Sequence, residues 1–244
     1  MLVLGCGYHY PEVILFFNAL RYAVGLDVKN TFYKNGIVKT FRTKKKERNA
    51  VTAFLGTAVT RYIYQRYYQH LEKISGIKID HKQYNLLSYD GSRMPFKNMA
   101  FDVVLSNAVL EHAGNLEQLV QEIYRVTKKE GISYHLWHNF YSFSGSHASK
   151  FICRRYPWGH LRAKYETHGL NRFTPTDIQN IFSKHFDIIA LYQIDKNHWK
   201  KGYDSAFQFE EESLLTESIK KELIDFPIEM LLTRSYLIIC RKRV

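Results

Sequence analysis

The chain has 244 residues, of which 45% are hydrophobic and 24% charged, and its formal net charge is +12. This length and apolar content suit one globular domain and argue against a disordered chain. The apolar runs are far shorter than the ~20 residues that cross a bilayer, and the three scattered cysteines suggest neither a disulfide framework nor a zinc site. A cytoplasmic location is therefore expected. The positive charge favours acidic partners such as nucleic acid, anionic lipid headgroups or anionic small molecules, although it could equally serve solubility alone.

The first 28 residues have the pattern of a strand, a glycine turn, a helix and a second strand. The apolar run 1–4 leads into Gly5-Cys6-Gly7, Pro11 suits the first position of a helix, and Asp27 closes the next apolar run. This βαβ pattern predicts a parallel sheet, in which ligands bind beyond the carboxyl ends of the strands. Gly5 and Gly7 would let the backbone approach a ligand closely, and Asp27 could accept both hydroxyls of a ribose. The pattern favours an adenosine-type ligand; the alternative is a strand-end turn followed by a helix-capping acid.

Residues 29–76 interrupt this alternation with a basic and helical segment. It contains the run Lys44-Lys45-Lys46-Glu47-Arg48, and then apolar residues at helical spacing before Gly76, a suitable C-cap. The apolar residues mark one stripe and its phase-shifted continuation: Val51, Leu55, Ala58 and Tyr62, then Ile63, Tyr67, Leu71 and Ile74. We expect a partly exposed helical insertion within one domain of residues 1–244.

Strands and helices alternate over the rest of the chain. Strands are expected at 84–89, 101–106, 131–137, 186–192 and 235–240, and helices from Asn115, from Thr174-Pro175 and from Glu211. This alternation predicts an α/β fold with a mainly parallel sheet.

Four segments agree, in order and spacing, with a set of known motifs. They are Leu4-Gly5-Cys6-Gly7; Tyr89-Asp90-Gly91-Ser92-Arg93-Met94-Pro95-Phe96 with Phe101-Asp102-Val103-Val104; Val109-Leu110-Glu111-His112; and the segment from Glu122 to Gly131. Together they resemble class I S-adenosylmethionine-dependent methyltransferases, particularly the type 11 group with its small-molecule and lipid-quinone enzymes. The resemblance covers residues 1–138 apart from the insertion. It implies a Rossmann-like, seven-stranded, mainly parallel sheet with an antiparallel last strand and helices on both faces.

The same resemblance implies roles for cofactor-binding residues. Gly5 and Gly7 would approach the methionine part of S-adenosylmethionine, and Asp27 its ribose. Asp90 and the Gly91 amide would face the adenine, and Asn107 the methyl-transfer region. Two residues depart from the family pattern. Val3 stands where an acid is usual, and His9 stands where a further glycine is usual.

The segment after the fifth expected strand contains several histidines, among them His138 and His147. Removal of a proton from an oxygen acceptor suits a base with a pKa near neutral, which is the natural role of histidine. We expect His138 and His147 as candidate bases, with His112 third; the alternative for each is that it only forms hydrogen bonds within the fold. The histidine intervals match no standard metal signature, so no metal is expected.

The predicted function is methyl transfer from S-adenosylmethionine, to oxygen of a small molecule, glycan or lipid-linked precursor that is anionic or held at a membrane surface. The insertion would recognise this acceptor. Three alternatives stay open. A silent methyltransferase-like scaffold is prompted by Val3 and His9. A nucleic-acid-directed methyltransferase is prompted by the charge, although the fourth strand lacks the Asn/Asp-Pro-Pro-aromatic motif. A nicotinamide-binding protein would need G-x-G-x-x-G, but Tyr10 occupies its last position.

Overall fold

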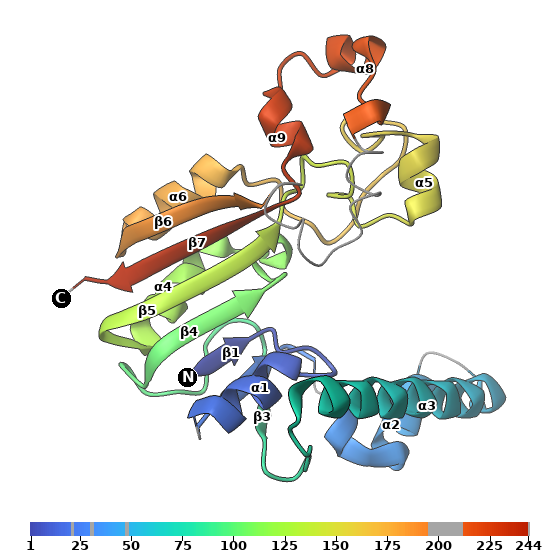
Figure 1. Cartoon of the computed structure of the whole chain (residues 1–244), viewed down its shortest axis with the longest axis vertical. Helices are drawn as coiled ribbons and strands as arrows, with labels where there is room; N and C mark the ends of the chain where they lie inside the picture. Colours follow the sequence, from blue (N-terminus) through green and yellow to red (C-terminus); the bar gives the residue numbers. More distant parts are fainter. Residues whose placement is uncertain (21, 30–31, 47–48, 195–211, 244) are drawn as a thin grey trace. The chain divides into compact units, whose positions relative to one another are not determined.

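The computed structural model describes residues 1–244 apart from 21, 30–31, 47–48, 195–211 and 244 (Figure 1). The chain divides into two compact units, Met1–Phe96 and Lys97–Val244. In the part of the chain that the structure describes, every helix is too short or too polar to cross a membrane.

The first unit contains three parallel strands in the order β3-β2-β1. Its elements are β1 (Leu2–Leu4), α1 (Pro11–Leu20), β2 (Val24–Asp27), η1 (Tyr33–Asn35), α2 (Gly36–Lys45), α3 (Ala50–Ser75) and β3 (Asn85–Ser88). Leu4 pairs with Leu26, and Asp27 pairs with Ser88, so the carboxyl ends of the three strands meet at one edge. The predicted βαβ start is confirmed.

The predicted helical insertion consists of α2 and α3, which pack against each other (Figure 1). Asn49 caps the start of α3 by accepting the Thr52 amide, and Gly76 ends the helix in the left-handed region with φ 69°. The expected apolar stripe, however, does not face the protein. Val51, Leu55 and Tyr62 are exposed, and the buried residues of α3 are Ala53, Thr57 and Tyr68. Glu47 and Arg48 of the basic run lie outside the described residues.

Among its described residues, the second unit contains four strands in the order β4-β5-β7-β6. Its elements are β4 (Phe101–Asn107), η2 (Leu110–His112), α4 (Leu116–Val126), β5 (Thr127–His138), α5 (Lys150–Arg155), α6 (Pro175–Ser183), β6 (Phe186–Ile194), α8 (Glu217–Glu222), α9 (Ile228–Leu232) and β7 (Ser235–Lys242). β4 and β5 are parallel, whereas β7 runs antiparallel to both β5 and β6. With the three strands of the first unit, this gives the predicted seven-stranded, mainly parallel sheet with an antiparallel last strand.

Two helices of this unit begin at the capping residues that the sequence predicts. Asn115 caps α4 through the Gln118 amide, and Thr174 forms a capping box with Asp177 at α6. Two boundaries differ from expectation. β5 begins at Thr127 rather than Gly131, because the chain enters the strand directly from α4. The helix expected from Glu211 is described only as α8, capped by Thr216, and position 211 lies outside the described residues.

A small second core lies beyond the carboxyl end of β5, where α5, α8 and α9 gather (Figure 1). Its buried residues are Phe143, Cys153, Trp158, Leu215, Ile219, Leu223 and Leu231. The Trp158 indole N–H donates to the Leu231 carbonyl at 3.3 Å, which joins two segments far apart in sequence. This core holds the loop that follows β5.

Candidate functional site

The glycine turn after β1 and the acid after β2 contact each other directly. The Gly7 amide donates to one carboxylate oxygen of Asp27 at 2.8 Å, and the Lys29 amide donates to the other at 2.9 Å. Gly5 and Gly7 both adopt positive φ, 67° and 66°, which strongly favours glycine. A Cβ added at Gly7 would meet no described atom within 4 Å, so open space lies beside the turn. The turn therefore combines open space with a neighbouring carboxylate.

Asp90 and Gly91 lie at the same edge of the first unit. The Tyr89 amide donates to the Asp27 carbonyl, and a Cβ on Gly91 would lie 3.6 Å from Val28. Asp90 is exposed and accepts both the amide and the hydroxyl of Ser92, and these bonds hold the pKa of its carboxyl below the ordinary value. The structure thus brings Gly5, Gly7, Asp27, Asp90 and Gly91 to one strand edge.

The two departures from the family motif have local structural explanations. Val3 is buried within β1. The ring of His9 packs edge-on against Tyr64 of α3, with centroids 4.2 Å apart, and the Tyr68 hydroxyl donates to the His9 carbonyl. Helix α3 therefore holds the loop that follows β1. The His9 ring packs against this helix and does not fill the space beside Gly7.

In the second unit, Asn107, predicted to face the methyl-transfer region, and the three predicted histidines lie at the ends of the adjacent parallel strands β4 and β5 or in the segments that follow them. Asn107 ends β4, pairs with Leu136 of β5 and is exposed. The turn after it brings Glu111 and His112 into η2, while His138 ends β5. His147 comes from the loop that follows β5 and has a φ of 55°.

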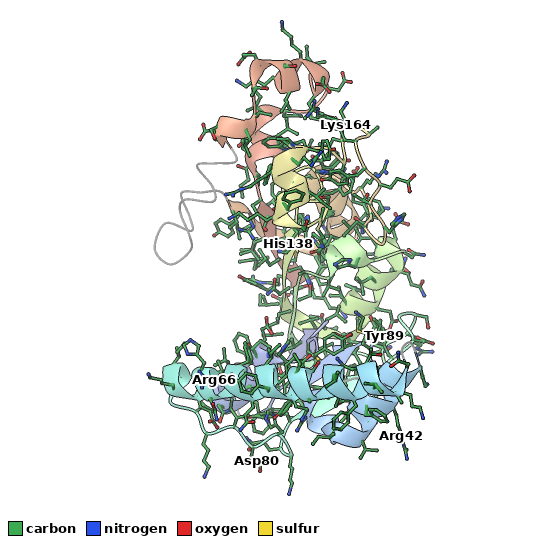
Figure 2. All side chains as sticks on the ribbon, turned by 90° about the vertical axis from the view of Figure 1, so that its right-hand side faces the viewer. Arg42, Arg66, Asp80, Tyr89, His138 and Lys164 are labelled. Carbon is green, nitrogen blue, oxygen red and sulfur yellow. The ribbon has the colours of Figure 1, made fainter. Side chains whose placement is uncertain are left out.

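His138, which Figure 2 labels, and His147 lie together with the buried carboxylate of Glu111, and His112 joins them through its contact with His147. His138 Nδ1 lies 3.1 Å from His147 Nε2 and 3.7 Å from an oxygen of Glu111. The rings of His112 and His147 meet edge-on with centroids 5.2 Å apart. Glu111 is only 3% exposed, whereas His112 and His147 reach the surface. The group thus combines one buried carboxylate with two exposed imidazoles.

Neighbouring segments hold this site in place. The Asn171 side-chain amide donates to the carbonyls of Leu110 and Ala113, and the Asn171 main-chain N–H donates to the Glu111 carbonyl. His112 Nδ1 lies 3.0 Å from the Gly169 carbonyl. Since a carbonyl only accepts, Nδ1 carries the proton and Nε2 holds the lone pair of the neutral ring.

Burial dominates the electrostatics of the cluster. It raises the pKa of Glu111 and lowers the pKa of His138 to about 4, with smaller lowering effects from His147, Arg234 and His112. Partial desolvation also lowers the pKa of His147. Burial therefore favours the neutral rings of His138 and His147, whose nitrogen lone pairs are available to a proton or to a cation.

Sequence reasoning found the histidines but gave no role to Glu111. The acid was visible in the Leu-Glu-His segment, yet its burial depends on how η2 packs. Asn171 was also missed, because it reaches the site from a loop far along the chain.

A second candidate surface lies on α2 and α3. A groove of about 410 Å³ is lined by Ile37, Val38, Phe41, Phe54, Thr57, Ala58 and Arg61. Val38 and Phe54 are 64% and 65% exposed. Residues 29–76 contain 11 Lys and Arg but only 2 Glu and no Asp, a net charge of +9 out of +12 for the whole chain. Figure 2 shows Arg42 and Arg66 on this helix pair.

Comparisons with known proteins identify the family of this chain. Residues 2–134, more than half of the chain, match the family model described as a methyltransferase domain. No curated protein sequence gives a significant match.

Two solved structures resemble the fold at low sequence identity. One is a putative methyltransferase from Bacillus halodurans, at TM-score 0.53 and 15% identity over 100% of this chain and 92% of that one. The other is the complex of the Haloferax volcanii Trm112 methyltransferase activator with a putative methyltransferase, at TM-score 0.52 and 15% identity over 100% and 82%. The chain therefore belongs to the methyltransferase-domain family, the class I enzymes whose methyl donor is S-adenosylmethionine.

Proposed function

We propose that this methyltransferase acts on an oxygen of a small molecule, a glycan or a lipid-linked precursor, and that the α2–α3 surface favours a lipid-linked acceptor at an anionic membrane. The two units are proposed to be parts of one methyltransferase domain, since the family model spans both. The proposed division of labour is cofactor binding by the first unit and acceptor activation by the second.

For cofactor binding, Asp27 is proposed to accept the ribose hydroxyls, and Asp90 with the Gly91 amide to face the adenine. Gly5 and Gly7 offer close backbone approach, and Asn107 is proposed to face the methyl-transfer region. When bound, S-adenosylmethionine supplies an electrophilic methyl group. The chain's task is then to orient the acceptor in line with that methyl group and to exclude water.

For acceptor activation, the proposed base is one of the clustered histidines. The hydrogen bond from His112 Nδ1 to Gly169 leaves Nε2 as a proton acceptor in an exposed position. His138 and His147 instead face each other and the Glu111 carboxylate. This arrangement favours His112 as the base and gives the other two a supporting role.

The observation that carries the acceptor proposal is the combination of exposed apolar side chains and strong positive charge on α2–α3. Exposed Ile37, Val38 and Phe54 could enter the boundary between headgroups and acyl chains, while Lys39, Arg42 and Lys45 attract anionic headgroups. The aliphatic side chains of Ile37 and Val38 give nucleic acid neither stacking nor hydrogen bonds, so these two residues favour a lipid surface over nucleic acid. The silent-scaffold alternative is disfavoured by the open space beside Gly7.

Vesicle binding tests this proposal. Wild-type protein should bind phosphatidylcholine vesicles that contain phosphatidylglycerol, and binding should weaken as salt rises. Replacing exposed Lys39, Arg42, Lys45 and Lys46 with Gln should weaken binding on the order of 100-fold or more, at about 1 kcal/mol per charge. Val38→Ser with Phe54→Ser should also weaken it. Lys44 stays unchanged, because its ammonium bonds Gly56 and Thr60 and joins the two helices.

The matched control is Ile74→Ser, which removes an equally exposed apolar residue of α3 outside the groove. This variant should bind vesicles like the wild type, and all variants should retain S-adenosylhomocysteine affinity. The proposal is wrong if wild-type protein ignores anionic vesicles at low salt, or if Ile74→Ser weakens binding as much as the groove variants.

A further inference from the structure

We propose that Glu111, His138 and His147 form a binding site for one divalent first-row transition-metal ion. Each residue offers one ligand atom, and the three atoms lie within 4.8 Å of one another. The residues come from the ends of two adjacent parallel strands and the loop after the second, so the fold assembles them from separate segments. No local sequence motif could show this grouping.

The first argument is the buried carboxylate. Glu111 is only 3% exposed, and its Oε1 accepts a long 3.3 Å bond from the His138 amide. Among the described residues, nothing donates to or accepts from its other oxygen, Oε2. Protonation would not satisfy that atom, since an O–H group also needs a partner. A bound cation would compensate the buried charge directly.

The second argument is the spacing of the donor atoms. Two nitrogens bound about 2.1 Å from one ion, at angles of about 90° to 109°, lie roughly 3.0 to 3.4 Å apart. His138 Nδ1 and His147 Nε2 are 3.1 Å apart. Glu111 Oε1, at 3.7 Å from His138 Nδ1, can complete one face of a coordination sphere with a small side-chain adjustment, and bidentate binding would also engage the unpartnered Oε2.

The third argument concerns which ion fits and what it could do. Two imidazoles and one carboxylate suit Zn²⁺, Co²⁺ or Fe²⁺, whereas Mg²⁺ and Ca²⁺ prefer oxygen ligands. Three protein ligands leave coordination positions open, and the exposed side of His147 makes them reachable from solvent. A hydroxyl bound there would lose its proton more easily. This catalytic use rests on the proposed function, but metal binding itself does not.

Direct metal binding tests the site. Untagged protein, stripped with a chelator, is titrated with Co²⁺ and followed by its visible absorption, and then with Zn²⁺ by calorimetry. We expect one ion per chain for each metal and no comparable binding of Mg²⁺ or Ca²⁺. Loss of an outer-shell partner typically weakens metal affinity about 10- to 100-fold, so Glu111→Gln or His147→Ala, which lose a direct ligand, should weaken it at least about 100-fold.

The control is His168→Ala, which removes an exposed histidine that lies beside Glu166 outside the cluster. Its Co²⁺ affinity should equal that of the wild type. Circular dichroism checks folding, and S-adenosylhomocysteine affinity is measured in parallel, so that a failed metal site is distinguishable from a failed methyltransferase assignment. The proposal is overturned if no stoichiometric Co²⁺ or Zn²⁺ binds, or if binding survives Glu111→Gln.

Discussion

The carboxylate of Asp27 stabilises its own loop while it faces the proposed cofactor site. It accepts the amides of Gly7 and Lys29, one on each oxygen. A carboxylate oxygen can accept more than one hydrogen bond, so each oxygen retains capacity for a ribose hydroxyl. Asp27 therefore orders the glycine turn and is available to the ligand.

Asp27→Ala should weaken S-adenosylhomocysteine binding by about 1.5–3 kcal/mol, or roughly ten- to hundredfold, because charge-assisted hydrogen bonds to the ribose are lost. Calorimetry measures the change. Asp80→Ala is the matched control, since Asp80 also accepts the amide two residues ahead, from Lys82 at 3.0 Å, but in another loop. Equal affinities of the two folded variants would refute the ribose assignment.

At the scale of elements, the loop between β5 and α5 determines where His147 lies. The Gly145 amide donates to the Ser142 carbonyl, and the His147 amide donates to the Ser144 carbonyl, so two consecutive turns carry the histidine. A Cβ added at Gly145 would overlap the carbonyl oxygens of Asn139 and Phe140. These are backbone atoms, which cannot move aside as easily as the end of a flexible side chain, so the turn itself would have to shift.

Gly145→Ala should therefore lower the free energy of unfolding by about 1–3 kcal/mol, the usual cost of overpacking, and should weaken Co²⁺ binding through displacement of His147. Urea unfolding measures the first effect. Gly114→Ala provides the control, because a Cβ there would meet no described atom within 4 Å. If both variants unfold at the same urea concentration, the Gly145 turn has more room than the structure shows.

Helix α3 shows where reasoning from sequence reached its limit. Its helical spacing and its end at Gly76 were predictable from local residues. The face of α3 that becomes buried could not be predicted, because it is determined by contacts with η1 and with the loop after β1. Tyr68 packs against Tyr10 and Tyr33, while the more aliphatic stripe with Val51 and Leu55 stays exposed. Hydrophobic spacing alone therefore indicated the wrong face of α3 as the buried one, because the stripe that it marks is exposed to solvent.

At the scale of the whole molecule, the mainly parallel sheet and the family could be predicted because successive parallel strands are followed by their own local motifs. The turn at Gly5, the acid at Asp27 and the segment at Asp90 could each be read from a few neighbouring residues. The Glu111 grouping could not, because it depends on the register of β4 against β5 and on a loop that returns to them. Contacts between distant segments leave no periodic signal in one sequence.

The free energy of unfolding should vary with pH largely because of His135, which is buried in the second unit. His135 is fully buried between the hydroxyls of Ser106 and Ser133, and its ring lies against Phe182. Burial lowers the pKa of this histidine to about 3. Since the folded-state pKa lies below the unfolded value, about 6.5, the native state favours the neutral ring. Stability is then fully present above about pH 6.5 and is lost as the pH falls toward 3.

Between pH 8 and pH 5, His135 should account for a loss of about 2 kcal/mol in the free energy of unfolding, because the unfolded chain takes up a proton that the native state refuses. His135→Gln keeps hydrogen-bonding groups for the two serines but cannot titrate, so its loss over this range should be smaller than that of the wild type by that amount. Urea unfolding at the two pH values gives the comparison. His168→Gln, at an exposed position, should keep the full wild-type dependence. If His135→Gln loses as much stability at pH 5 as the wild type does, another group must account for the acid sensitivity.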